Sequence, residues 1–121
     1  ILICTPEGEL HNIACNMIES LLLSKGFKIY NISPSVPLDS IVGYVKNIDP
    51  DIILISVTLE ENIMAVKRLI NQIRSKFPIP VVVGGEAVNR LVVGSMIDVI
   101  IMQDGSLSEL VKLINSAFST R

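Results

Sequence analysis

The sequence predicts a doubly wound α/β domain in which about five parallel strands are joined by helices. Short continuous apolar runs alternate with segments whose apolar residues recur every three or four positions, as strand–helix repeats require. Half of the 121 residues are hydrophobic and only 4% are aromatic, which is typical of an aliphatic sheet buried on both faces. Because parallel crossovers are right-handed and pack back onto the sheet, this alternation favours one doubly wound sheet.

The elements are expected in regular alternation along the chain. Strands are expected at residues 1–4, 27–32, 51–57, 81–83 and 97–102. Helices are expected at about 11–25, 38–48, 61–76 and 86–93, and from about 106 onward. Gly26 is a suitable residue to end the first helix, and Asp49-Pro50 ends the second. Ser106 to Glu109 has the pattern of a capping box for the last helix.

Composition excludes several classes of function. The formal net charge is −2 and the ten basic residues are scattered, so we do not expect this domain to bind nucleic acid. No apolar run is long enough to span a bilayer and no basic-then-apolar leader is seen, so a soluble domain without a membrane partner is expected. Cys4 and Cys15 fit no CxxC or zinc pattern, which favours buried, reduced thiols in a cytoplasmic protein.

Several functions of doubly wound folds lack their motifs here. The turn at residues 5–9 has no GxGxxG pattern and carries two carboxylates that would repel a pyrophosphate. A P-loop is missing, and the ends of the third and fifth predicted strands lack the Asp and Lys of a phosphate-accepting receiver. A thiolate pair between His11 and Cys15 or Cys4 finds little support, because nothing marks an oxyanion hole or a third member.

The ends of the predicted strands carry the candidate site. Residues 5–14, 56–59, 84–85 and 103–105 should share the edge where open α/β sheets bind ligands. The first of these stretches holds the only histidine, His11, two residues after Glu9. Imidazole is a common metal ligand, and a carboxylate that accepts its other N–H fixes the tautomer. A single histidine does not hold a free ion, so the pattern indicates a metal that arrives within its own macrocycle.

Three motifs at these strand ends resemble the cobalamin (vitamin B12)-binding domain family, whose fold is Rossmann-like or flavodoxin-like. That family carries Asp-x-His-x-x-Gly after the first strand, Ser-x-Leu or Ser-x-Thr after the third, and Gly-Gly after the fourth. The corresponding stretches here are Glu9-Leu10-His11-Asn12-Ile13-Ala14, Ser56-Val57-Thr58-Leu59 and Gly84-Gly85. Glu9 replaces the family's Asp, and Ala14 replaces its Gly.

The resemblance implies that residues 1–121 form one cobalamin-binding domain. Because the sequence opens directly on strand residues without Met, we expect it to be part of a longer protein. His11 would be the metal ligand, binding cobalt in the base-off, His-on mode and displacing the cofactor's own base. Glu9 would accept the other ring N–H of this imidazole.

The remaining cofactor-binding residues follow from the same resemblance. The displaced nucleotide tail would lie beside Ser56 and Thr58, and Gly84 and Gly85 would allow its close approach to the backbone. The methyl group of Ala14 would face the corrin or the tail. The alternative is that Ser56 and Thr58 only end a strand and cap a helix, while the glycine pair only forms a turn.

Glu-x-His, and the acidic Glu60 after Ser-x-Thr-Leu, also resemble B12-dependent light-sensing transcriptional regulators of the MerR type. The first expectation is therefore a sensory module for adenosylcobalamin in transcription regulation, partnered by an upstream helical bundle or DNA-binding region. Alternatives are a methyl-carrier corrinoid protein domain that uses methylcobalamin, the small domain of an adenosylcobalamin mutase, and a B12-like fold without cofactor. All of these allow a homo-oligomer, and none requires enzyme activity from this domain alone.

Overall fold

Five parallel strands form one sheet in the order β2-β1-β3-β4-β5 in a computed structural model that describes residues 1–87, 99–101 and 107–119. The strands are β1 (Leu2–Cys4), β2 (Tyr30–Asn31), β3 (Ile53–Ser56), β4 (Val81–Gly84) and β5 (Val99–Ile101). The helices are α1 (Ile13–Ser24), α2 (Leu38–Ile48), α3 (Ile63–Lys76) and α4 (Leu107–Ser119), with a short 3₁₀ helix η1 (Glu60–Asn62) before α3. The predicted doubly wound parallel fold is confirmed.

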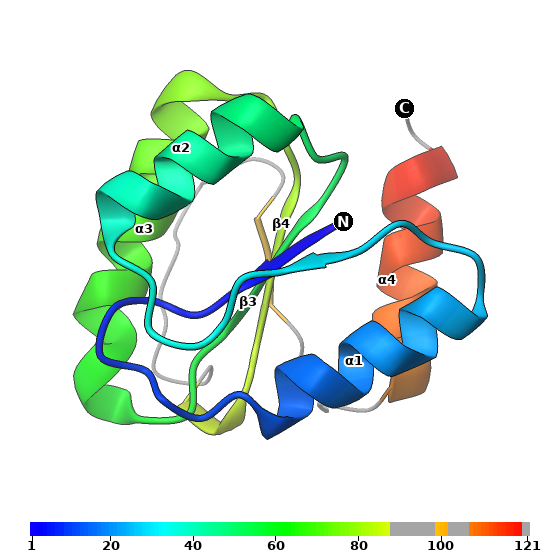
Figure 1. Ribbon diagram of the computed structural model, residues 1–121, viewed down its shortest axis with the longest axis horizontal. Coiled ribbons are helices and arrows are strands. Elements are labelled where there is room, and N and C mark those ends of the chain that lie inside the picture. Colours follow the sequence, from blue (N-terminus) through cyan, green and yellow to red (C-terminus); the bar gives the residue numbers. More distant parts are fainter. Residues whose placement is uncertain (88–98, 102–106, 120–121) are drawn as a thin grey trace.

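The sheet separates two hydrophobic cores. Helices α2 and α3 cover one face, and α1 and α4 cover the other (Figure 1). Side chains alternate along each strand, so Ile53 and Ile55 of β3 belong to the first core, whereas Ile52 and Leu54 belong to the second. This two-sided burial explains why β3 reads as an unbroken aliphatic run.

The ends of the elements differ from the predictions in ways that have local causes. The predicted strand 27–32 is reduced to Tyr30–Asn31, because the Phe27 N–H bonds to the Leu22 carbonyl and completes the end of α1 instead. Gly26, with φ +91°, ends that helix as expected. The chain enters α3 through η1 rather than directly at Glu61.

Some predicted elements fall partly or wholly outside the described residues. Most of the helix expected at 86–93 and all of the stretch 103–105 belong there. Among the described residues, no helix combines the length and the apolar character that a membrane crossing requires.

Candidate functional site

The loop between β1 and α1 is held in shape by hydrogen bonds to the segment after β2. Ser35 donates its backbone N–H to Thr5 Oγ1 at 2.8 Å and to the Glu9 carbonyl at 2.9 Å. Its hydroxyl oxygen accepts the Gly8 N–H at 3.0 Å. Gly8 has φ +94°, and a Cβ there would lie 3.0 Å from Asn62 Oδ1, so both backbone and space favour glycine. These contacts fix where residue 9 points.

Glu9 places a buried carboxylate at the carboxyl edge of the sheet. The residue is fully buried, yet its Oε2 accepts three hydrogen bonds from the segment that follows β3. The donors are the Thr58 N–H at 3.0 Å, the Leu59 N–H at 3.3 Å and the Asn62 side-chain amide at 2.9 Å. Its other oxygen, Oε1, lies 3.0 Å from His11 Nδ1. Both carboxylate oxygens are therefore used.

The ionised form of Glu9 is the one this environment favours. Burial alone would raise the pKa of the carboxyl, but the hydrogen bonds from Thr58, Asn62, Leu59 and His11 together outweigh it and lower the pKa. A carboxylate in this state can only accept hydrogen bonds. His11 must then carry its proton on Nδ1 and donate it to Oε1.

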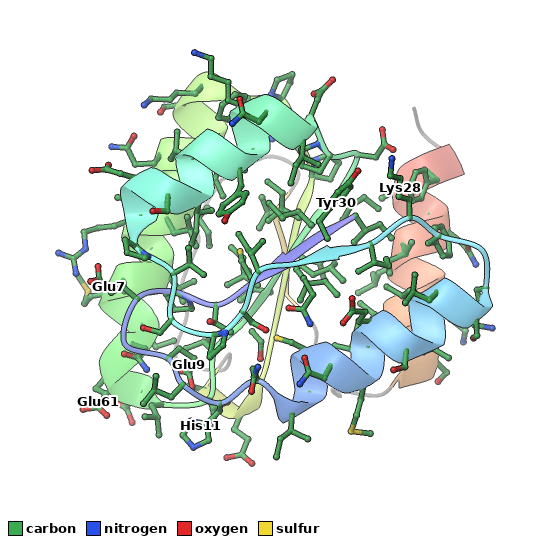
Figure 2. The ribbon with its side chains drawn as sticks, viewed as in Figure 1. Glu7, Glu9, His11, Lys28, Tyr30 and Glu61 are labelled. Atoms are coloured by element: carbon green, nitrogen blue, oxygen red, sulfur yellow. The ribbon has the colours of Figure 1, made fainter. Side chains whose placement is uncertain are left out.

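His11 presents its other ring nitrogen outward. Its side chain is 58% exposed, while the carboxylate that it contacts is fully buried. Figure 2 shows His11 at the periphery of the molecule, beyond Glu9. With Nδ1–H committed to Glu9, the lone pair of a neutral ring resides on Nε2, which is free to ligate a metal. The predicted carboxylate–histidine contact is present in the structure.

The surface beside His11 is unusually apolar. Leu10 is 70% exposed and Ile13 is 76% exposed, and these two residues flank His11 in the sequence at the entry to α1. Met17, one turn further along α1, is also exposed. The imidazole therefore stands at the border of an aliphatic patch.

Ser56 and Thr58, which the sequence predicted as site residues, have different places in the structure. Ser56 ends β3 and is half-buried. Burial raises the pKa of the Cys15 thiol, and the side chains of Ser33 and Ser56 offset part of that rise. Thr58 acts through its backbone N–H, which contacts Glu9. Ala14, in the first turn of α1 beside Cys15, is exposed.

The predicted glycine pair is explained largely by the chain's own packing. Gly84 pairs with Ser56 in the sheet, and its carbonyl accepts the Val57 N–H at 2.9 Å. Gly85 has φ +113°, and a Cβ at this position would lie 2.2 Å from the Val57 carbonyl oxygen. The close approach that requires Gly85 is thus made by Val57, whose carbonyl also accepts the Ala87 N–H at 3.2 Å.

Sequence reasoning missed Asn62, which is 8% exposed and contacts Glu9 directly. A polar residue just before the apolar face of the third helix was the available signal, but it is also what an ordinary helix start contains. Among the described residues, no three His, Cys, Asp or Glu side chains gather as a metal site. The outward Nε2 of His11 can supply one bond to a metal whose other ligands come from elsewhere.

A parallel sheet of order 2-1-3-4-5, with a carboxylate-oriented histidine at its carboxyl edge, defines a doubly wound domain of the open α/β class, in which ligands bind at that edge. Residues 1–110 match the family described as "B12 binding domain". The chain belongs to this cobalamin-binding domain family, and the predicted family resemblance is confirmed.

Individual relatives, at 24% and 27% sequence identity, support the same family. The chain is 27% identical over 84 residues to a dimethylamine corrinoid protein of Methanosarcina barkeri, covering 67% of this chain and 39% of that protein. It is 24% identical over 93 residues to methionine synthase of Mycobacterium tuberculosis, covering 74% of this chain and 8% of that enzyme. The chain thus spans about two fifths or less of the length of these relatives.

A solved structure confirms the fold independently. The methanol:cobalamin methyltransferase complex of Methanosarcina barkeri includes a chain that superposes with a TM-score of 0.81 at 17% identity. The match covers 99% of this chain and 46% of that one. The sequence relatives named here are a corrinoid protein and methionine synthase rather than transcriptional regulators, so they favour the methyl-carrier alternative over the regulator that the motifs first suggested.

Proposed function

We propose that this domain carries cobalamin for a methyltransferase system and holds the cobalt through His11. The observation that carries the proposal is the Glu9–His11 contact, in which a buried, ionised carboxylate fixes the ring so that Nε2 faces outward. The corrinoid relatives favour a carrier, and the partner would be a methyltransferase. When bound, the corrin cobalt supplies the group-transfer chemistry.

The chain's own residues divide the work of binding. His11 provides the axial nitrogen, and Glu9 holds its tautomer and raises its basicity as a ligand. Thr58, Leu59 and Asn62 hold Glu9 ionised by donating to Oε2. The expected tail-binding surface comprises Ser56 and Thr58 at the end of β3, together with Ala14, Gly84 and Gly85.

The exposed aliphatic side chains beside His11 suit the same proposal. A corrin ring is a broad, largely apolar surface, and Leu10 and Ile13 offer apolar contact next to the axial nitrogen. Because the chain covers 39% of its corrinoid relative, the elements that would cover the other face of the ring are assigned to the rest of the assembly.

The decisive experiment is a visible-spectrum titration of the full chain with hydroxocobalamin, methylcobalamin and adenosylcobalamin. The parent should give the spectrum of histidine ligation, and His11→Ala should lose it. Adding imidazole to His11→Ala should restore the spectrum, because the free base replaces the missing ring. Ser20→Ala, an exposed change further along α1, serves as the control and should behave as the parent.

Two results would contradict the proposal. Identical spectra for the parent and a folded His11→Ala would remove His11 as the ligand. Binding followed by a light-dependent change in oligomeric state with adenosylcobalamin, and no methyl exchange with a corrinoid methyltransferase, would return the assignment to a sensory module.

A further inference from the structure

Thr5 is a buried polar residue that the cobalamin assignment leaves without a role. In the described part of the chain, the buried polar or charged residues are Thr5, Glu9 and Asn62. Burying a hydroxyl or an amide costs free energy unless it is hydrogen-bonded, and both Thr5 and Asn62 make hydrogen bonds with Glu9. The buried polarity of the described residues therefore converges on the partner of His11.

Thr5 and Ser35 together hold the main-chain carbonyl of Glu9. The Ser35 N–H donates to that carbonyl at 2.9 Å and to Thr5 Oγ1 at 2.8 Å. The Thr5 hydroxyl in turn donates to the same carbonyl at 3.3 Å. These three contacts form a triangle that joins the β1–α1 loop to the segment between β2 and α2. We call this triangle the Thr5–Ser35 brace.

Ser35 makes its contacts from an unusual backbone conformation. Its φ of +49° lies in the left-handed region, which a residue with a Cβ rarely adopts. Such a conformation persists where surrounding contacts hold it, and here those contacts include the two hydrogen bonds of the Ser35 N–H. The brace therefore depends on the backbone of Ser35 as well as on the hydroxyl of Thr5.

Glu9 is thereby anchored at both of its ends. The carboxylate is held through Oε2 by the segment after β3, where Asn62 donates at 2.9 Å. The main chain of Glu9 is held by the Thr5–Ser35 brace. His11, two residues further on, takes its position from this main chain, whereas Oε1 takes its position from the carboxylate. The 3.0 Å contact between His11 Nδ1 and Glu9 Oε1 therefore requires both anchors.

We propose that Thr5 and Ser35 are positioning residues for axial ligation, because their brace keeps the proton of His11 on Nδ1 and leaves Nε2 for the metal. Neither residue touches the imidazole; both act through the main chain of Glu9. Without the brace, the carboxylate stays with its donors while the main chain leading to His11 shifts, and the contact between Nδ1 and Oε1 is lost. The use of the oriented ring rests on the proposed function.

The test is an NMR spectrum of the imidazole nitrogens in the full cofactor-free chain at about pH 8, above the ordinary titration range of histidine. His11 is the only histidine, so the spectrum reports one ring. The parent should carry its proton mainly on Nδ1. Thr5→Val removes the bridging oxygen with little change of shape, and the ratio of Nδ1–H to Nε2–H should fall about three- to tenfold, as expected for loss of one hydrogen bond.

A second pair of variants tests the backbone of Ser35. In Ser35→Val, the β-branched side chain opposes a φ of +49°, so the ratio should fall as in Thr5→Val. Ser35 is half-buried, so this variant provides the same test if Thr5→Val does not fold. Ser35→Gly adopts the left-handed conformation freely and keeps the N–H donor. It should stay within about twofold of the parent, because water can replace the hydroxyl at the exposed Gly8 N–H.

Two controls separate positioning from stability. Thr5→Ser keeps the hydroxyl and loses one buried methyl group, so it should be less stable than the parent but keep the parent's tautomer ratio. Gly26→Ala places a Cβ at a φ of +91° after α1, with no atom within 4 Å. It should also lower stability without changing the ratio. The same variants are then titrated with hydroxocobalamin, and the fraction with a histidine-ligated spectrum should follow the tautomer ratio.

Three results would overturn the proposal. They are a parent ring protonated mainly on Nε2, an unchanged ratio in a folded Thr5→Val or Ser35→Val, and an equal fall of the ratio in Gly26→Ala. If the ratio falls as expected but the parent gives no histidine-ligated spectrum, the brace still controls the tautomer and the proposed function fails. If the parent ligates cobalt through His11 and both valine variants keep the parent's ratio, only the brace fails.

Discussion

Asn62 and Glu9, which are 53 positions apart in the sequence, meet in the buried centre of the site, where Asn62 Nδ2 donates to Glu9 Oε2 at 2.9 Å. The contact joins the segment after β3 to the loop after β1. Because Asn62, Thr58 and Leu59 all donate hydrogen bonds to Oε2, the other carboxylate oxygen, Oε1, is left for His11. The imidazole is thus oriented by residues that do not touch it.

Asn62→Ala tests how much this hydrogen bond contributes to the free energy of unfolding. The change leaves Glu9 with one fewer donor in a buried site, so the free energy of unfolding should fall by about 1–3 kcal/mol. Urea unfolding at neutral pH measures it. Asn71→Ala, at an exposed position of α3, is the matched control and should change stability by no more than about 0.5 kcal/mol. Equal effects would contradict the assigned role of Asn62.

Glu9→Gln tests the ionised state. The carboxyl has a lower pKa in the folded chain than the ordinary value of 4.5, so its contribution to stability is complete above about pH 4.5 and is lost as the pH falls through the folded pKa. The gap in unfolding free energy between parent and Glu9→Gln should therefore be largest near neutrality and narrow in acid. Urea unfolding over a pH series measures this gap, and a constant gap would exclude an ionised Glu9.

The same variant should weaken cobalamin binding without removing the axial nitrogen. Loss of the charged partner of a metal-bound histidine commonly costs about 10–100-fold in affinity. The visible spectrum of the bound state should still report histidine ligation. Spectral titration of Glu9→Gln beside His11→Ala separates orientation of the ring from ligation itself.

Gly85→Ala should be the most damaging single methyl addition among these tests. The new Cβ would lie 2.2 Å from the Val57 carbonyl oxygen, at a φ of +113°. We expect a loss of about 2 kcal/mol or more. Gly43→Ala, in α2 with no atom within 4 Å of the new Cβ, should instead gain roughly 0.5–1 kcal/mol. Thermal unfolding of both variants provides the comparison.

The two thiols should be inert in the folded chain. Burial raises the pKa of Cys4 to about 12, with a smaller contribution from Cys15, and burial raises the pKa of Cys15 as well. At pH 8 only about one Cys4 thiol in ten thousand would be ionised. A colorimetric thiol reagent should react with neither residue until denaturant is added. Rapid reaction of either thiol in the native chain would contradict the described burial.

Ala14→Gly tests the position at which this chain departs from the family motif. Ala14 is exposed in the first turn of α1, so glycine should cost about 0.5–1 kcal/mol of stability. If the methyl group faces the corrin or its tail, the same variant should bind cobalamin more tightly. Paired measurements of unfolding and affinity test both effects, and unchanged affinity would place the methyl group away from the cofactor.

Sequence patterns were sufficient for the fold and for the Glu9–His11 pair, because both depend on local spacing. Aliphatic runs and helical periods determine the elements, and a separation of two residues within one loop brings the carboxylate to the ring. The complete burial of Glu9 could not be read in the same way. It depends on donors from another loop, whose approach is a property of the folded sheet.

The glycine pair is a second case in which the sequence pattern did not reveal a contact between distant segments. Gly84-Gly85 was correctly placed at the end of β4, but a pattern of two glycines does not say which atoms approach them. In the structure the approaching group at Gly85 is the Val57 carbonyl, set by the pairing of β3 with β4. Contacts between distant segments were therefore the part that sequence reasoning could not supply.

Leu10 and Ile13 leave exposed aliphatic surface beside the outward-facing Nε2 of His11. Water next to such side chains is released when something flat covers them, and full burial of each is worth about 1.5–3 kcal/mol. A flat ligand whose metal bonds to Nε2 would therefore also gain free energy by covering Leu10 and Ile13.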